Sequence, residues 1–154
     1  MSYLNMQDEK LIPVVVELNT LLANYHIYYQ KLRNFHWNIL GENFFELHNK
    51  FEELYSDART KIDEIAERIL TLEGTPLHTF SDYLTNSSIE EVKAMSSGRD
   101  GVAVVSKNFS VLIQQERKIL ALAADADDEG TVSLMSDYIS ETEKTLWMLS
   151  SYLA

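Results

Sequence analysis

Histidine and carboxylate side chains recur at helical spacing between His36 and Glu67. His48 lies four positions before Glu52, and Asp63 lies four positions before Glu67. On a helix, each of these pairs shares one face and points into the same small volume. Imidazole nitrogen and carboxylate oxygen together are the ligands of non-haem iron sites. The stretch therefore predicts a metal-oxidation site, and the rest of the chain is expected to hold these residues in position.

The usual site of a di-iron helix bundle is missing from the sequence. Soluble di-iron bundles carry a Glu-x-x-His motif on two of their helices, aimed into the core. The residues three before the four histidines of this chain are Ala23, Arg33, Phe45 and Thr75. A site inside a single bundle is therefore not predicted.

The two helical pairs are too far apart to meet within one chain. His48 and Asp63 are 15 residues apart, which is about 22 Å along a helix. Metal–ligand bonds are only about 2 Å long. A second, antiparallel copy would bring the dicarboxylate pair of one chain beside the histidine pair of the other, across a two-fold axis near Asp57–Ala58. The small side chain of Ala58 is expected at the crossing, with His36 reaching in from the preceding helix.

A simpler interpretation of the same residues is available. Charged pairs of this kind are typical of any solvated helix, and a histidine beside a tryptophan is typical of packing at a helix end. The joint fit favours the metal site, because two histidines and three carboxylates close only by symmetry.

Two long helices are predicted around this stretch. Apolar residues recur at helical spacing from Leu11 to about Leu40, with Pro13 expected in the first turn and Gly41 as the stop. A second helix is predicted over about 43–72.

Residues 74–100 form a long connection before the second half of the chain. Ser88 and Glu91 match a capping box, which predicts a short helix near 88–95. Asp100 is expected to cap a third long helix, and a fourth should follow an acidic turn. We therefore predict an all-α, ferritin-like four-helix bundle, with a short extra helix in the long crossover between the second and third helices. It should be a single domain over 1–154, with a short N-terminal arm over 1–7.

The composition of the chain argues against several classes of function. The formal net charge of −11 disfavours a nucleic-acid surface and suits a protein that attracts cations. The chain has no cysteine, which excludes disulfides, zinc–thiolate sites and iron–sulfur clusters. The start, MSYLNMQDEK, shows no signal peptide, and no stretch is apolar enough to span a membrane. A cytoplasmic location is therefore expected.

The pattern FHWN…LH…FEELY…DEIAER, together with EGT and EKTLWML, resembles the Dps family, the mini-ferritins named as DNA-binding proteins from starved cells. The resemblance covers nearly the whole chain. It implies a dodecameric shell, built from two-fold dimers, that oxidises iron(II) with hydrogen peroxide, or with dioxygen more slowly. The ferric mineral is stored inside, which protects against oxidative damage. Carried over by position, the implied ferroxidase ligands are His36, His48 and Glu52 of one subunit, with Asp63 and Glu67 of its partner.

Other positions acquire expected roles from the same resemblance. Glu52 departs from the family's common Asp, and its longer side chain is still expected to coordinate. Asp128 and Glu129 are the candidates for an acidic pore that admits ions, although a solvated acidic turn capping a helix is the alternative. Glu53 is a candidate for mineral nucleation. Trp37 and Tyr55 lie near the site, either as packing or as groups that pass electrons, and His26 and His78 are expected to be structural.

DNA binding is not expected to carry over from the family. The N-terminal arm offers only Lys10 between acidic neighbours, and a shell of chains at −11 should repel DNA. The alternative function is a structural or DNA-compacting assembly whose metal site is vestigial or filled with zinc.

Overall fold

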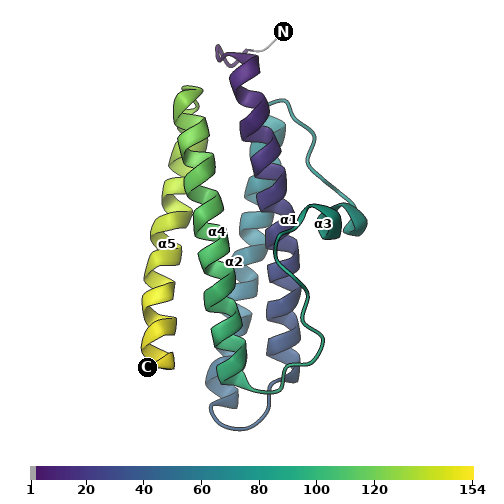
Figure 1. Cartoon of the computed structure of the whole chain (residues 1–154), viewed down its shortest axis with the longest axis vertical. Coiled ribbons are helices and arrows are strands. Elements are labelled where there is room, and N and C mark those ends of the chain that lie inside the picture. The colour runs from purple at the N-terminus through teal and green to yellow at the C-terminus, as the bar shows by residue number, and fades with distance from the viewer. Residues whose placement is uncertain (1–2) are drawn as a thin grey trace.

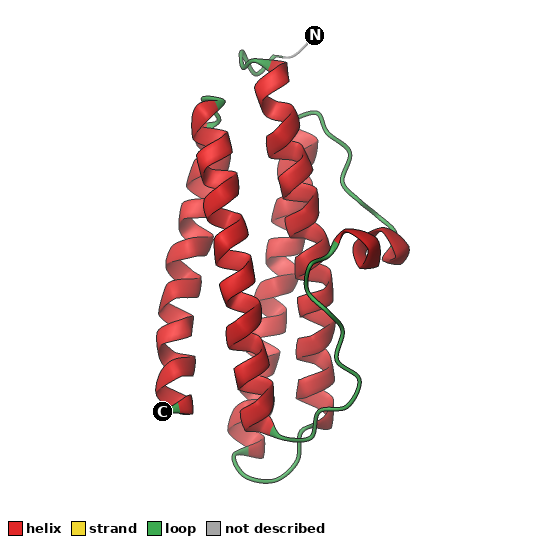
Figure 2. Cartoon of the chain, in the orientation of Figure 1, coloured by secondary structure: helices red, strands yellow, loops and turns green. Residues whose placement is uncertain are grey.

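The computed structural model describes residues 3–154, and two of the residues of the predicted arm lie outside that range. The chain is a bundle of four long helices with a fifth, short helix that projects from the crossover (Figure 1, Figure 2). The helices are α1 (Asp8–Asn38), α2 (Phe44–Thr71), α3 (Phe80–Asn86), α4 (Gly98–Asp125) and α5 (Glu129–Leu153). The predicted ferritin-like architecture, with its extra helix between the second and third long helices, is confirmed.

The core lies where the apolar stripes of the long helices meet. Leu18 and Phe35 of α1, Phe51 of α2 and Leu112 of α4 are all completely buried. Burying one such side chain contributes about 1.5–3 kcal/mol. Gly101 lets α4 approach closely, because an added Cβ would lie 3.2 Å from the Phe51 ring. Within residues 3–154, no helix has the length and apolar character needed to cross a membrane.

The short helix of the crossover forms earlier than predicted. It spans Phe80–Asn86, and Thr79 caps it by accepting a hydrogen bond from the backbone N–H of Asp82 at 3.1 Å. The predicted helix near 88–95 is wrong. The side-chain oxygen of Asn24 accepts hydrogen bonds from the backbone N–H groups of Ser88 and Ile89, and Ile89 is buried in the core. These contacts hold the segment in an extended conformation against α1.

Two predicted helix starts also need correction. Helix α1 begins at Asp8, so Pro13 lies inside the helix rather than in its first turn. Helix α4 begins at Gly98, because Ser97 is the cap and accepts from the backbone N–H of Asp100 at 3.2 Å. Asp100 is therefore a first-turn acid and not the cap.

Candidate metal centre

The two histidines of the predicted site lie against each other where α1 and α2 meet. Gly41 (φ 90°) and Asn43 (φ 59°) adopt left-handed conformations in the turn between these helices, which reverses the chain. The rings of His36 and His48 stack with centroids 3.8 Å apart and planes 12° apart. His36 is almost fully buried. The structure therefore brings together the two imidazoles that the sequence singled out.

Each histidine orients the other through the backbone. Nδ1 of His36 lies 2.7 Å from the carbonyl oxygen of His48, and Nδ1 of His48 lies 2.7 Å from the carbonyl oxygen of His36. A carbonyl oxygen only accepts, so both Nδ1 atoms carry the proton and donate it. In the neutral rings both Nε2 atoms then hold a free lone pair. Fixing a metal-binding histidine through its other nitrogen is the usual arrangement in metal sites.

The carbonyl of His36 is available because α1 ends there. In a longer helix it would accept from the N–H of Leu40, but Leu40 donates instead to the carbonyl of Ser96 in the crossover, at 2.9 Å. Two further aromatic rings pack against the histidines. The ring of Phe44 stacks on that of His48, with centroids 5.1 Å apart, and the ring of Tyr55 packs edge-on against that of His36, with centroids 5.4 Å apart. The histidine pair is therefore rigid before any metal binds.

The carboxylates of the predicted site are exposed on α2. Glu52 lies one turn after His48, and Asp63 and Glu67 lie further along the helix. Repulsion from Asp63, together with a hydrogen bond between the two side chains, raises the pKa of Glu67. A cation bound between them would relieve that repulsion. Within residues 3–154, no three histidine or acidic side chains gather closely enough to hold a metal ion.

The crossing point predicted on α2 needs correction. Ala58 is completely buried in the core of its own bundle, so it does not face a partner. The outward face of α2 instead carries two large exposed apolar residues, Phe45 near its start and Leu70 near its end. They lie equally far on either side of the point between Asp57 and Ala58.

The acidic turn before α5 divides into a buried and an exposed part. Asp128 is the N-cap of α5 and is buried, and its side chain accepts from the backbone N–H of Thr131 and pairs with Arg68 at 2.5 Å. Its predicted place in a pore is therefore wrong, since its charge is used to join α2 to α5. Asp127 and Glu129 are exposed. Elsewhere, the exposed Glu53 pairs with Lys50 at 2.7 Å.

The remaining histidines and Trp37 occupy other surroundings. His26 stacks on Tyr83 at 3.8 Å, and burial lowers its pKa. His78 lies 3.0 Å from the carbonyl oxygen of Pro76. Trp37 is exposed, and the guanidinium of Arg33 lies 4.7 Å from its ring.

A buried polar layer in the middle of the bundle escaped the sequence analysis. Glu116 is completely buried, and its Oε1 accepts from the hydroxyl of Tyr25 at 2.8 Å, while Oε2 has no partner within residues 3–154. Burial raises the pKa of Glu116 to about 7. Nearby, the buried ammonium of Lys61 donates to Asp57 and Glu141. The sequence could have indicated this buried glutamate, because position 116 falls on the apolar stripe of its helix, between Leu112 and Ile119.

Comparisons with known proteins match the whole of this architecture. The model of the ferritin-like domain matches residues 15–154. The DNA protection during starvation protein of Porphyromonas gingivalis is 42% identical over 96% of this chain and 92% of its own length. A crystal structure of a Dps protein from Vibrio cholerae O1, described as a member of a superfamily of ferritin-like diiron-carboxylate proteins, is 47% identical, with a TM-score of 0.97 over 100% of this chain and 97% of that one. A Dps protein from Bacillus brevis is 39% identical, with a TM-score of 0.93 over 97% of this chain and 100% of that one.

Proposed function

This chain belongs to the Dps family of ferritin-like proteins, and from that premise we propose that it is a cytoplasmic ferroxidase that oxidises iron(II) and stores the ferric product. The observation that carries the proposal is the histidine pair. Two stacked imidazoles, each with Nδ1 donating to a carbonyl oxygen, leave Nε2 as the nitrogen that can bind a metal. Borderline nitrogen ligands of this kind bind iron(II), and carboxylates favour the iron(III) product.

The exposed face of α2 supports a two-fold partner. His48 with Glu67 and Glu52 with Asp63 are centred on the same point of the helix, between Asp57 and Ala58. In an interface related by a two-fold axis, each residue meets its counterpart about that centre. An antiparallel partner would thus place its Glu67 beside His48 and its Asp63 beside Glu52.

The apolar residues at the ends of this face fit the same centre. Phe45 and Leu70 would meet each other twice, once at each end of the contact, and large exposed side chains of this type mark protein interfaces. We propose that two equivalent sites form in this way, each from His36, His48 and Glu52 of one subunit with Asp63 and Glu67 of the other.

Two iron ions at one site supply the chemistry that a single ion lacks. Two iron(II) ions give two electrons to one hydrogen peroxide, which takes up two protons and leaves as water. A single iron(II) would give one electron and release hydroxyl radical. The proposed site thereby protects as it oxidises, and dioxygen is a slower alternative oxidant.

Storage follows from assembly and charge. We propose a dodecamer of these two-fold dimers, in which the exposed Glu129 and Asp127 attract iron(II) at a pore and the exposed Glu53 helps to nucleate mineral. The charge of −11 per chain supports cation uptake and opposes DNA binding. Zinc is the expected competitor at the site, because imidazole and carboxylate also suit that ion.

The test is anaerobic addition of iron(II) followed by hydrogen peroxide, with ferric absorbance and peroxide consumption measured together. We expect a fast rise with about two iron ions oxidised per peroxide. The His36→Ala/His48→Ala variant should lose the fast phase while keeping its helical content. Oxidation that is equally fast in the variant would reject the site. The absence of a fast phase in the wild type would reject the ferroxidase, and a zinc-filled or DNA-compacting assembly would then be the better description.

A further inference from the structure

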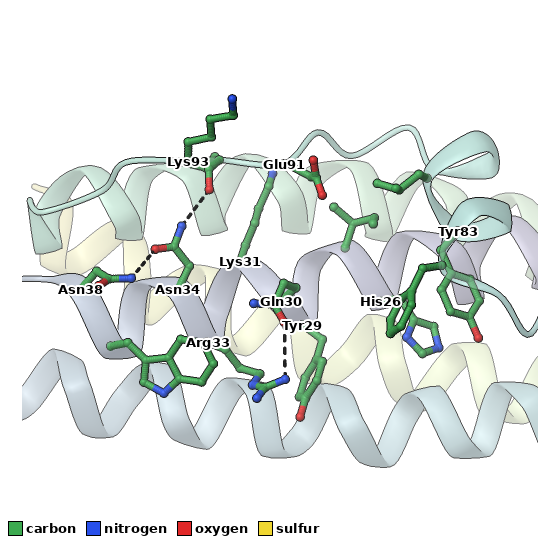
Figure 3. Close-up of a pocket in the computed structure, with 15 residues that line it drawn as sticks. His26, Tyr29, Gln30, Lys31, Arg33, Asn34, Asn38, Tyr83, Glu91 and Lys93 are labelled. Atoms are coloured by element: carbon green, nitrogen blue, oxygen red, sulfur yellow. Dashed lines mark hydrogen bonds between the residues drawn. The ribbon is translucent and has the colours of Figure 1, made fainter.

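Arg33 carries a positive charge without an acidic partner among residues 3–154. Its guanidinium lies between two rings, 5.3 Å from the centroid of Tyr29 and 4.7 Å from that of Trp37. Its one hydrogen bond is to the amide oxygen of Gln30, at 3.4 Å, and within residues 3–154 no carboxylate forms an ion pair with it. Figure 3 shows Arg33 and Tyr29 extending together from α1 toward α2. An arginine fixed on aromatic faces keeps its fork of N–H donors free for a planar acceptor.

This arginine is held beside the metal centre. Arg33 precedes His36 by three residues, which is about 4.5 Å along the helix. The Tyr29 ring that supports the guanidinium packs edge-on against Tyr55 at 5.9 Å, and Tyr55 packs against His36 at 5.4 Å. An unbroken series of ring contacts therefore fixes the position of Arg33 relative to the histidine pair.

The two-fold arrangement proposed above places an acid opposite this guanidinium, and the inference rests on that arrangement. Helices α1 and α2 run antiparallel, with His36 level with His48, so Arg33 is level with Phe51 of its own chain. Position 52 of α2 faces position 63 of the antiparallel partner. We infer that Arg33 forms charge-assisted hydrogen bonds with Asp63 of the partner subunit and positions that carboxylate for iron.

The contact between Arg33 and the partner's Asp63 would balance charges that are unbalanced within each chain. In one chain Asp63 and Glu67 are like charges one turn apart on α2, and they repel each other. A guanidinium donating to one oxygen of the partner's Asp63 reduces that repulsion and leaves the other oxygen free for the metal. Arg33 is thus a positioning residue, acting through the partner's carboxylate and not on iron itself.

Cross-linking tests the geometry without using iron. Because the chain has no cysteine, the only thiols in the Arg33→Cys/Asp63→Cys variant are the two introduced ones. The Arg33→Cys and Asp63→Cys single variants report any pairing between like positions. A long arginine reaches an aspartate whose Cα is too distant for a direct disulfide, so a short bifunctional maleimide is used in place of oxidation. We expect a covalent dimer on a denaturing gel from the double variant and not from either single variant. The Lys93→Cys/Asp63→Cys variant is the matched control, since Lys93 and Arg33 line one pocket from opposite sides, Lys93 on the crossover and Arg33 on α1 (Figure 3). Absence of the dimer in the test variant, or equal yields in both, would overturn the placement of Arg33.

Kinetics test the positioning role. Arg33→Gln should raise the iron(II) concentration that gives half-maximal rate roughly tenfold, the effect of losing one charge-assisted hydrogen bond, with kcat changed less than about twofold. Arg33→Lys should restore most of the loss, and Lys93→Gln should change neither constant. An unchanged KM in Arg33→Gln, or no rescue by lysine, would refute the role.

The two experiments separate this inference from the proposed function. Cross-linking in a protein that does not oxidise iron would reject the ferroxidase and retain the contact between Arg33 and the partner's Asp63. Normal iron oxidation with neither cross-link nor kinetic effect would reject the contact alone.

Discussion

Replacing Glu116 with glutamine should make the bundle more stable at alkaline pH and change it little at acidic pH. Burial raises the pKa of this carboxyl from 4.5 to about 7. Below pH 4.5 the group is protonated in both folded and unfolded chains and carries no penalty. Above pH 4.5 the unfolded chain releases the proton, but the folded chain keeps it until about pH 7, because releasing it would bury a charge. The stability conferred by the protonated group is thereby lost between about pH 4.5 and 7.

The size of the effect follows from the shift. Each pKa unit corresponds to about 1.4 kcal/mol, so the difference of about 2.5 units gives roughly 3 kcal/mol at pH 8. Glutamine keeps the oxygen that accepts from Tyr25 and never ionises. The stability difference, variant minus wild type, should therefore rise by roughly 3 kcal/mol between pH 4 and pH 8.

Urea unfolding followed by circular dichroism, at one fixed protein concentration and several pH values, measures this difference. Glu42→Gln is the control, because Glu42 is exposed. In Tyr25→Phe, loss of the hydrogen bond that favours the carboxylate should move the transition to higher pH. Parallel stability curves for Glu116→Gln and wild type over this range would refute the reasoning.

Three further predictions address the site and its frame. Phe45→Asp or Leu70→Asp should dissociate the two-fold dimer, as sedimentation velocity would show; an unchanged mass would remove this face of α2 from the interface. Ala58→Leu should cost about 1–3 kcal/mol of stability in urea by overpacking the core, with assembly intact; loss of assembly at unchanged stability would return Ala58 to the interface. Asp128→Ala should cost about 3–5 kcal/mol of stability in the same assay, because it leaves Arg68 unpaired. Glu129→Gln should slow iron uptake without lowering stability. Similar stabilities for the two variants would contradict the division of this acidic turn into a buried and an exposed part.

Periodicity was sufficient to predict the bundle, because long apolar stripes leave few other folds. Periodicity could not predict that Thr79 and Ser97 are the residues that cap α3 and α4. Each competes with nearby residues of equal capping ability, and the choice is made by tertiary contacts such as Asn24 with the chain at Ser88. Spacing likewise placed the histidines near each other, yet their mutual bonding depends on the end of α1 at Asn38.

The predicted two-fold centre illustrates a different limit. Spacing along α2 predicts a centre between Asp57 and Ala58, but the prediction assigned Ala58 to the wrong side of the helix. A small residue fits a close helix crossing and a packed core equally well, so size alone does not choose between them. Asp128 shows the same ambiguity for charge, since an N-cap and a pore both call for an acid.

The hydrogen bond from Leu40 to Ser96 has a consequence for the order in which the histidine pair forms during translation. Until the chain at Ser96 has emerged and docked, the N–H of Leu40 is free to bond to the carbonyl of His36 and extend the first helix. That bond would compete with Nδ1–H of His48 for the carbonyl oxygen of His36. In a ribosome-bound fragment that ends before the crossover, we therefore expect the two imidazoles to be held less firmly, although both histidines have already been translated. The proposed iron site would then be completed only after more than half of the protein exists.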